Sequence, residues 1–327
     1  TMPNLEILSN IRSHLDEITS SPVSGLEKLA WLPSGAEALN PQSRMAGYQL
    51  IHDDKPIFFL PGIPSQMKQL LVEEVLPKLS TWHKDHRLTT YQRIFRIFNL
   101  PETEVNRRIS TLDLSTDVHI GYYPVFPEVH LSLTVRDHKT NNGKRLFKSS
   151  CKAINTVLGD SIYGCDRDSM ERTVGKLLSR HKLTLAVAES CTGGLICRKL
   201  TNSPGSSSYF LGGVVAYANS LKSKYLSISN DIIDKRGAVS REVAEAMAVG
   251  MREGCGADIG LAITGIAGPD GGTEDKPVGT VYIAIATVEE NSVTKFLFQG
   301  YRYQVREISA LSGLDLIRKY VLQKEEE

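Results

Sequence analysis

The chain has 327 residues, of which 41% are hydrophobic and 23% charged, and its formal net charge is +1. This length predicts two or three domains, and the near-neutral charge gives no general argument for binding nucleic acid or an anionic membrane surface. No apolar run reaches the roughly 18 residues of a spanning helix, and the first residues do not resemble a secretory signal. The five cysteines form no CxxC pair, so we expect no disulfide framework. Together these features predict a cytoplasmic protein.

Residues 1–82 have the pattern of an α/β segment. Apolar residues recur at helical spacing over 5–18, and residues 55–60 (KPIFFL) form an expected strand. Ser65 is then in position to cap a helix over residues 66–79. The polar run TWHKDHRL at 81–88 is expected to be a linker.

A second unit covers residues 83–165. The pattern predicts three strands and two helices in the order β-α-β-β-α, with strands at 90–98, 118–123 and 129–135 and helices at 101–109 and 146–158. The result is a small α+β domain with the shape of RNA-binding KH modules. The GxxG loop that clamps a nucleic-acid backbone in those modules is absent, so we do not expect nucleic-acid binding here.

The third unit, residues 166–327, alternates strands and helices, which predicts a three-layer α/β/α domain. The expected strands are 183–187, 212–217, 259–264, 278–287 and 294–298, and Ser240 is expected to cap a long helix. Residues 231–238 are expected to be a connecting loop. Polar loops that follow successive strands should gather at one edge of the sheet, where ligands bind in such folds.

The segment AESCTGG at 188–194 stands at this edge and contains two candidate nucleophiles, Ser190 and Cys191. Because a helix is expected directly after it, free backbone N–H groups and two glycines would face a ligand there. A thiol at a helix start has a lowered pKa, although a small buried filler is the commoner role of such a cysteine. The alternative is a plain strand-to-helix turn with a Ser or Thr cap.

Residues 182–327 contain no histidine, which excludes a Ser-His-Asp triad within this domain. A lysine is the usual substitute base, and it must be desolvated or lie near other cations to be neutral. Lys222 follows the strand that ends at Tyr217 by about one helical turn, whereas its competitor Lys224 lies on a different helical face.

Two further features suggest recognition of an anion. The loop TGIAGPDGG at 264–272 offers the Thr264 hydroxyl and several backbone N–H groups that could cradle a phosphate, although it lacks the GK[ST] of a P-loop. Arg302 and Arg306 are four residues apart and, in a helix, share a face that could bind an anionic group. The acidic residues in the loop are expected to be exposed rather than to hold a metal.

Several blocks together resemble the C-terminal domain of the CinA family, the nicotinamide mononucleotide deamidases. The blocks are AESCTGG (188–194), GGVVAYANSLK (212–222), GAVSREVAEAMAVG (237–250), TGIAGPDGG (264–272) and KPVGTVYIA (276–284). The preceding segments resemble the KH-like domain and part of the MoaB-like first domain of that family. The opening part of the first domain is missing, and Ser43 and Met45 replace an expected glycine and alanine.

The resemblance implies roles for individual residues. Ser190 would be the nucleophile, Lys222 its general base and Tyr217 a hydrogen-bonding partner. Ser206 or Ser207 could supply an oxyanion-hole N–H, and one of the two arginines would hold the phosphate. The expected substrate-binding residues are Thr192, Gly193, Ser207, Thr264, Gly265, Gly268, Arg302 and Arg306.

The expected activity is hydrolysis of nicotinamide mononucleotide to nicotinic acid mononucleotide and ammonia, in pyridine nucleotide recycling, without a metal or other cofactor. The resemblance also implies a homo-oligomer, with a dimer expected. Two alternatives remain open. One is the ADP-ribose pyrophosphatase activity attributed to the first domain of the family, and the other is a non-catalytic adaptor in competence or DNA damage.

Overall fold

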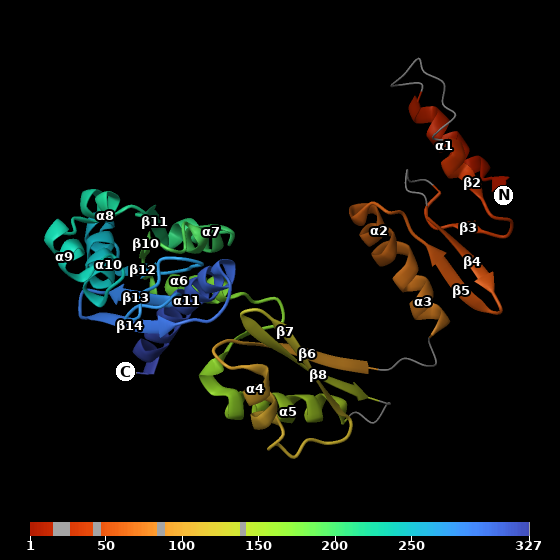
Figure 1. The fold of residues 1–327 in the computed structure, drawn as a ribbon. Coiled ribbons are helices and arrows are strands. Elements are labelled where there is room, and N and C mark those ends of the chain that lie inside the picture. The colour runs from red at the N-terminus through yellow and green to blue at the C-terminus, as the bar shows by residue number, and fades with distance from the viewer. Residues whose placement is uncertain (16–26, 42–46, 84–88, 138–141, 327) are drawn as a thin grey trace. The chain divides into compact units, whose positions relative to one another are not determined.

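The computed structural model describes residues 1–15, 27–41, 47–83, 89–137 and 142–326. The predictions on residues 16–18, on Ser43 and Met45, and on most of the linker lie outside these ranges. The chain divides into two compact units, Thr1–Leu88 and Thr89–Glu327. Both are built from helices and strands, which confirms the predicted α/β class (Figure 1).

The first unit contains two small antiparallel sheets. Its elements are β1 (Met2–Pro3), α1 (Leu5–Leu15), a 3-10 turn (Glu27–Ala30), β2 (Trp31–Leu32), β3 (Glu37–Ala38), β4 (Tyr48–His52), β5 (Lys55–Phe59), α2 (Pro64–Leu70), a π-helical turn (Leu71–Val75) and α3 (Leu76–Trp82). The β4–β5 hairpin turns through Asp53 and Asp54, whose φ angles of 48° and 58° suit a two-residue turn.

The predicted cap at Ser65 is wrong. The residue that precedes α2 is Ile63, and no side chain makes a cap hydrogen bond there. The helix begins instead at Pro64, whose fixed φ angle suits a first helical position and whose missing N–H is not needed. The predicted linker also begins too early, because α3 continues to Trp82.

The second unit begins with a four-stranded antiparallel sheet in the order β7-β8-β6-β9. Its elements are β6 (Thr89–Ile97), α4 (Glu102–Ile109), β7 (Val118–Val125), β8 (Glu128–Asp137), α5 (Gly143–Leu158), a 3-10 turn (Gly159–Ser161) and β9 (Ile162–Cys165). The predicted β-α-β-β-α order is confirmed, but the fourth strand was missed. Four residues are too few to show a clear alternation, and β9 forms by pairing with β6, which is distant in sequence.

The rest of this unit is a five-stranded sheet in the order β11-β10-β12-β13-β14. The first three strands in this order are parallel, and β13 and β14 are antiparallel to their neighbours. Its elements are α6 (Met170–His181), β10 (Leu185–Glu189), α7 (Leu195–Thr201), a 3-10 turn (Ser206–Ser208), β11 (Phe210–Val215), α8 (Asn219–Leu226), α9 (Asn230–Arg236), α10 (Arg241–Cys255), β12 (Ile259–Gly265), β13 (Thr280–Ala286), β14 (Asn291–Leu297) and α11 (Arg302–Glu326).

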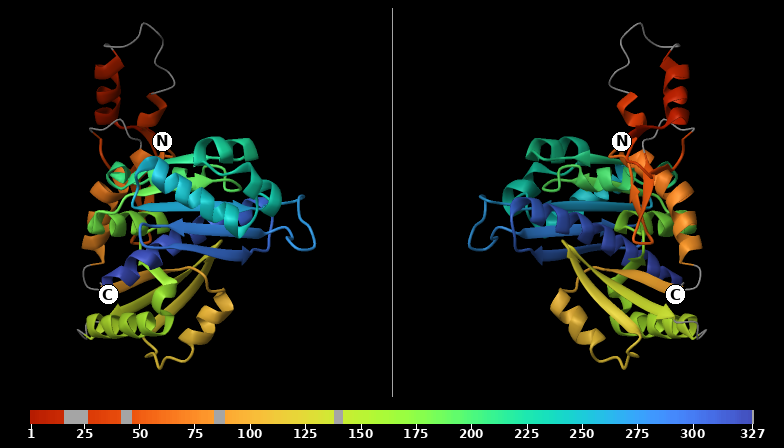
Figure 2. Two further views of the ribbon diagram at one scale, coloured as in Figure 1. Left: turned by 90° about the vertical axis from the view of Figure 1, so that its left-hand side faces the viewer. Right: turned by 90° about the vertical axis from the view of Figure 1, so that its right-hand side faces the viewer.

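Helices cover both faces of this sheet, so the predicted three-layer architecture is confirmed (Figures 1 and 2). One core joins the sheet to α6, α7 and α11, and the other joins it to α8, α9 and α10. The predicted loop at 231–238 is wrong, because most of it forms α9. This helix has seven residues and buries only Ile233, so it has no periodic apolar stripe to announce it.

Side-chain alternation along β10 assigns its residues to the two cores. Leu185 and Val187 pack in the α6, α7 and α11 core, whereas Ala186 and Ala188 pack in the α8, α9 and α10 core. Neighbouring strands add further alanines to the second face, so α10 lies very close to the sheet. A Cβ on Gly260 of β12 would stand only 2.2 Å from the carbonyl oxygen of Ala248 in α10. Small residues are therefore a packing requirement on this face.

The long helix α10 begins as predicted. The Ser240 hydroxyl accepts a hydrogen bond from the backbone N–H of Val243 at 3.3 Å, which confirms Ser240 as its cap. The helix ends at Gly256, which has the left-handed φ angle of 64° typical of a glycine after a helix.

The close packing of α10 predicts opposite effects of two Gly→Ala substitutions in that helix. A Cβ on Gly250 would lie 2.1 Å from the carbonyl oxygen of Leu226 at the end of α8. We expect Gly250→Ala to lower the free energy of unfolding by about 1–3 kcal/mol. A Cβ on Gly254 would have no atom within 4 Å, so Gly254→Ala should raise the free energy of unfolding by up to about 1 kcal/mol. Urea unfolding of both variants tests this, and equal stability would contradict it.

Candidate functional site

The candidate site lies where the three parallel strands β11, β10 and β12 end. The backbone N–H of Ser190 donates to the carbonyl of Ile263 at 2.9 Å, and that of Ala216 donates to the carbonyl of Glu189 at 2.8 Å. These bonds continue the strand pairing by one residue on each side, so the segments that follow the strands start side by side. The predicted gathering of polar residues at this edge is confirmed.

Ser190 begins a tight turn into α7. Its carbonyl accepts a hydrogen bond from the N–H of Gly193 at 3.1 Å. Gly193 and Gly194 have φ angles of 61° and 89°, which side-chain-bearing residues rarely adopt. A Cβ on Gly193 would also come within 3.3 Å of the Arg306 guanidinium. The two glycines therefore allow both the turn and the close approach of an arginine.

The two candidate nucleophiles belong to opposite sides of the sheet. Cys191 packs in the α6, α7 and α11 core. Ser190 continues the positions of Ala186 and Ala188, so strand alternation directs its side chain towards the α8 side. Lys222 of α8 is buried on that side. Strand alternation thus places the Ser190 side chain on the face of the sheet that α8 and Lys222 cover.

Lys222 is a buried cation, with only 1% of its surface exposed. Its Nζ donates to the carbonyl oxygens of Ala216 at 2.8 Å and Tyr217 at 3.1 Å, both directly after β11. An ammonium has three N–H donors, so one remains for a further acceptor. Burial lowers the pKa of Lys222, and the nearby Cys191 opposes this effect. Lys224, the competing base, is instead exposed, with its Nζ 5.1 Å from the centre of the Tyr225 ring.

The predicted lowered pKa of Cys191 is wrong. Burial raises the pKa of this thiol to about 12, and this effect outweighs the favourable charge of Arg306. Its position at the start of α7 is not enough to compensate for removal from water. Cys191 therefore carries a proton at neutral pH, which fits the alternative role of a small buried filler.

Both predicted arginines reach the site from the first two turns of α11. Arg302 donates to the Tyr217 hydroxyl at 2.9 Å and to the carbonyl of Gly268 at 2.7 Å. Arg306 donates to the carbonyl of Thr192 at 2.7 Å. Tyr217 is thus linked to Arg302 through its hydroxyl and to Lys222 through its carbonyl. These contacts leave further guanidinium N–H groups for an anion.

The glycine-rich loop joins this cluster on its other side. Thr264 is buried at the end of β12, and its hydroxyl donates to the carbonyl of Ala238 at 2.8 Å. Gly265 ends the same strand. Gly268 has a φ angle of 82°, and a Cβ there would lie 2.6 Å from a Val278 methyl. The loop is thus held in a shape that requires glycine at position 268.

Two predicted substrate-binding residues lie differently from expectation. Thr192 is fully buried, and its hydroxyl has no hydrogen-bond partner among the described residues. Ser207 lies in the 3-10 turn before β11, beside the N-terminal end of β10, where the N–H of Leu185 donates to the carbonyl of Tyr209. Because β11 has six residues, about 20 Å of strand separates that turn from the Ser190 edge. The structure does not bring Ser207 to the site.

Glu189 is a positioning residue that the prediction omitted. It is fully buried, and its carboxylate accepts hydrogen bonds from the N–H groups of Ile196 at 3.2 Å and Cys197 at 2.9 Å. The carboxylate thereby ties the end of β10 to the first turn of α7, across the Ser190 turn. A single acidic residue that ends an apolar strand is the signal that could have identified it.

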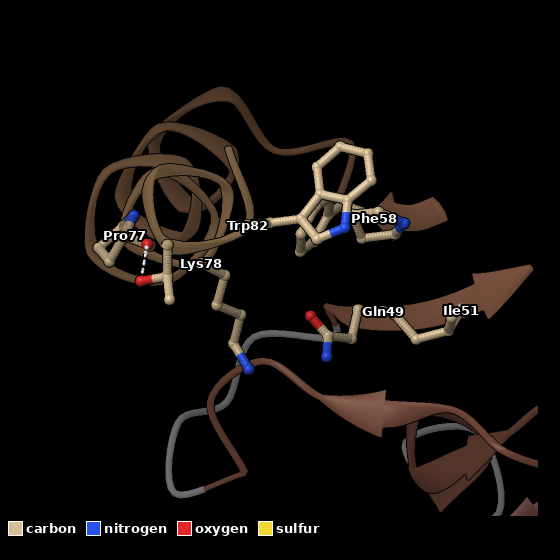
Figure 3. Close-up of a pocket in the computed structure, with 8 residues that line it drawn as sticks. Gln49, Ile51, Phe58, Pro77, Lys78 and Trp82 are labelled. Atoms are coloured by element: carbon tan, nitrogen blue, oxygen red, sulfur yellow. Dashed lines mark hydrogen bonds between the residues drawn. The ribbon is translucent and has the colours of Figure 1, made fainter. Parts of the chain in front are cut away.

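A second hollow lies in the first unit, with a volume of about 480 Å³. Figure 3 shows Trp82 extending from α3 towards Phe58 of the small sheet, with Lys78 and Gln49 nearby. Its lining is mostly apolar, and Lys78 is ion-paired with Glu37 at 2.9 Å. Unlike Lys222, the lysine of this hollow is thus paired with a carboxylate.

The described residues contain no group of three or more His, Cys, Asp or Glu side chains placed to hold a metal ion. In the same part of the chain, no helix is both long and apolar enough to cross a membrane.

The role of Glu189 predicts a loss of stability in Glu189→Gln. The amide replaces one acceptor oxygen by an NH2 group, which would face an N–H donor in a buried position. We expect the free energy of unfolding to fall by about 1–3 kcal/mol. Glu290→Gln, at an exposed position, is the matched control and should change it little. Chemical unfolding measures both, and an unchanged stability of Glu189→Gln would argue against the positioning role.

Family models and sequence relatives point to one family. Residues 92–164 match the CinA KH domain and residues 167–321 match the CinA C-terminal domain. A CinA-like protein of Desulfotalea psychrophila is 63% identical over 99% of this chain and 78% of its own length, and one of Syntrophotalea carbinolica is 38% identical over 97% and 76%. A solved CinA superfamily protein from Escherichia coli is 33% identical, covers 47% of this chain and 92% of its own, and has a TM-score of 0.45. This chain belongs to the CinA family.

Proposed function

We propose that the chain hydrolyses the carboxamide of nicotinamide mononucleotide, with Ser190 as nucleophile and Lys222 as base. The observation that carries the proposal is the burial of Lys222, which lowers its pKa, on the side of the sheet towards which Ser190 is directed. A lysine that is removed from water and faces no carboxylate is suited to accept a proton. The names of the relatives give the family, and the amide substrate is our inference.

In the proposed first step, neutral Lys222 takes the hydroxyl proton of Ser190 as its oxygen attacks the carboxamide carbon. The turn after Ser190 supplies donors for the oxyanion, because the N–H groups of Cys191 and Gly194 donate to no backbone carbonyl in the described ranges. The protonated Lys222 then gives its proton to the leaving nitrogen, and ammonia departs. Water, activated by the neutral lysine, attacks the ester and releases nicotinic acid mononucleotide and free Ser190.

The two arginines would orient the substrate. Arg302 and Arg306 lie one helical turn apart and both contact the segments that carry the proposed catalytic residues. Their guanidinium groups are suited to the phosphate of a mononucleotide. Arg302 also holds the hydroxyl of Tyr217, so phosphate binding at Arg302 would act on the residue whose carbonyl binds Lys222. We therefore favour Arg302 as the main phosphate ligand and assign Arg306 to the Ser190 turn.

The nucleophile is tested by comparing Ser190→Ala with Cys191→Ala in an assay that follows ammonia release from nicotinamide mononucleotide. We expect Ser190→Ala to lower kcat by at least about 10³-fold, because the attacking atom is removed. Cys191→Ala should keep most of the activity, since the protonated thiol takes no part. Loss of activity in Cys191→Ala together with retention in Ser190→Ala would reverse the assignment.

The base is tested by the pH dependence of kcat/KM. The reaction requires neutral Lys222, so activity should rise with pH as this ammonium loses its proton. Because burial lowers the pKa, the rise should be centred below the ordinary lysine value. Lys222→Met should remove the rise and most of the activity, whereas Lys224→Met should leave the profile unchanged. Activity that falls with rising pH over this range would contradict the assignment.

A further inference from the structure

A pocket in the C-terminal domain has a strongly basic lining. Its volume is about 360 Å³, and it lies among α9, the first turn of α10, the loop before β13, and strands β13 and β14. Five cationic side chains line it: Lys235, Arg236, Arg241, Lys276 and Lys295. None of them belongs to the proposed active site, so the pocket is a separate feature of the molecule.

The charge of this pocket is poorly compensated by the protein. Glu242 is the one acidic residue in the lining, and its carboxylate lies 3.2 Å from the Arg236 guanidinium. Within the described residues, no other ion pair is formed by the five cations. Four positive charges therefore remain in excess, if each lysine and arginine counts as +1 and Glu242 as −1. Like charges that line one pocket repel one another, and a bound anion would relieve that repulsion.

Several of these cations are held in place without being neutralised. Lys276 donates to the carbonyl of Arg236 at 3.0 Å, and Arg241 donates to the carbonyl of Val293 at 2.8 Å. Lys295 lies with its Nζ 5.9 Å from the centre of the Tyr282 ring. Backbone carbonyls and an aromatic ring orient a cation but leave its full charge. The pocket is thus preorganised for a ligand that brings the negative charge.

Residues 236–240 connect the pocket to the proposed active site. On the pocket side the Arg236 carbonyl binds Lys276, and two residues later the Ala238 carbonyl binds Thr264 of the proposed active site. The start of α10 adds positive potential, because the first N–H groups of this 15-residue helix lie at the pocket. The helix start therefore adds to the positive potential of the five side chains, which make up most of the charge of the pocket.

We propose that this pocket binds the phosphate chain of a di- or triphosphate. A single phosphate would leave most of the excess charge unmatched, whereas a triphosphate carries close to four negative charges at neutral pH. The volume of about 360 Å³ suits a compact polyanion. Lysines and arginines that come from four separate segments can surround such a chain, and arginine adds paired N–H donors for its oxygens.

The proposal is tested by isothermal titration calorimetry of the full chain with tripolyphosphate, ATP and sulfate at a fixed, low salt concentration. Tripolyphosphate should bind with one site per chain, and its affinity should fall as salt is added. ATP should bind about as tightly, because the phosphate chain is the recognised group. Sulfate that binds as tightly as tripolyphosphate would overturn the claim that a phosphate chain is recognised.

The site itself is tested with two double variants that make the same change of charge. Lys235 and Lys295 are exposed, so Lys235→Gln/Lys295→Gln should fold normally, which thermal unfolding checks. It should weaken tripolyphosphate binding by at least about tenfold, because two charged partners are lost. The control Lys152→Gln/Lys224→Gln, also at exposed positions, should leave the affinity unchanged. Equal weakening by both variants, or no weakening by the first, would overturn the proposal. If Lys235→Gln/Lys295→Gln does not weaken binding, the ligand binds elsewhere, for example at Arg302 and Arg306.

Discussion

The arrangement of the site depends on the burial of the Lys222 ammonium. Removing a cation from water is costly unless it is paired, and no carboxylate in the described chain lies within ion-pair distance of Lys222. Two backbone carbonyls directly after β11 offset part of that cost. Because this compensation is partial and comes from neutral groups, the charged form stays disfavoured, and burial makes the lysine easier to deprotonate.

The sheet around Lys222 explains why this arrangement can be built. Parallel strands bring the segments after β10, β11 and β12 to one edge, and alternation directs Ser190 to the lysine side while Glu189 turns back to anchor α7. The alanine face lets α10 pack closely on the sheet. The edge that results carries Ser190, the buried Lys222 and two arginines, and none of them lines the basic pocket.

The sequence predicted those parts of the site that depend on local pattern or on elimination. The absence of histidine narrowed the expected base to a lysine, the AESCTGG turn offered Ser190 and Cys191, and the resemblance to the CinA family favoured Ser190. The sequence also predicted the helix cap at Ser240 and the alternation of strands and helices in residues 166–327. The errors concern tertiary context. Burial decides the pKa of Cys191, and β9 forms only by pairing with a strand that is distant in sequence. Ser207 lies away from the site because its loop precedes β11, at the opposite end of the sheet from Ser190. Glu189 was missed because its partners belong to the next helix, across the turn.

The most direct measurement of the central claim is the pKa of Lys222 itself. Lysine-labelled protein can be titrated by NMR while the Nζ and Cε signals are followed, with Lys222→Met used to assign the resonance. We predict a pKa for Lys222 below the ordinary value of a lysine, because burial disfavours its charged form. A pKa for Lys222 equal to or above the ordinary lysine value would contradict its role as the base that activates Ser190.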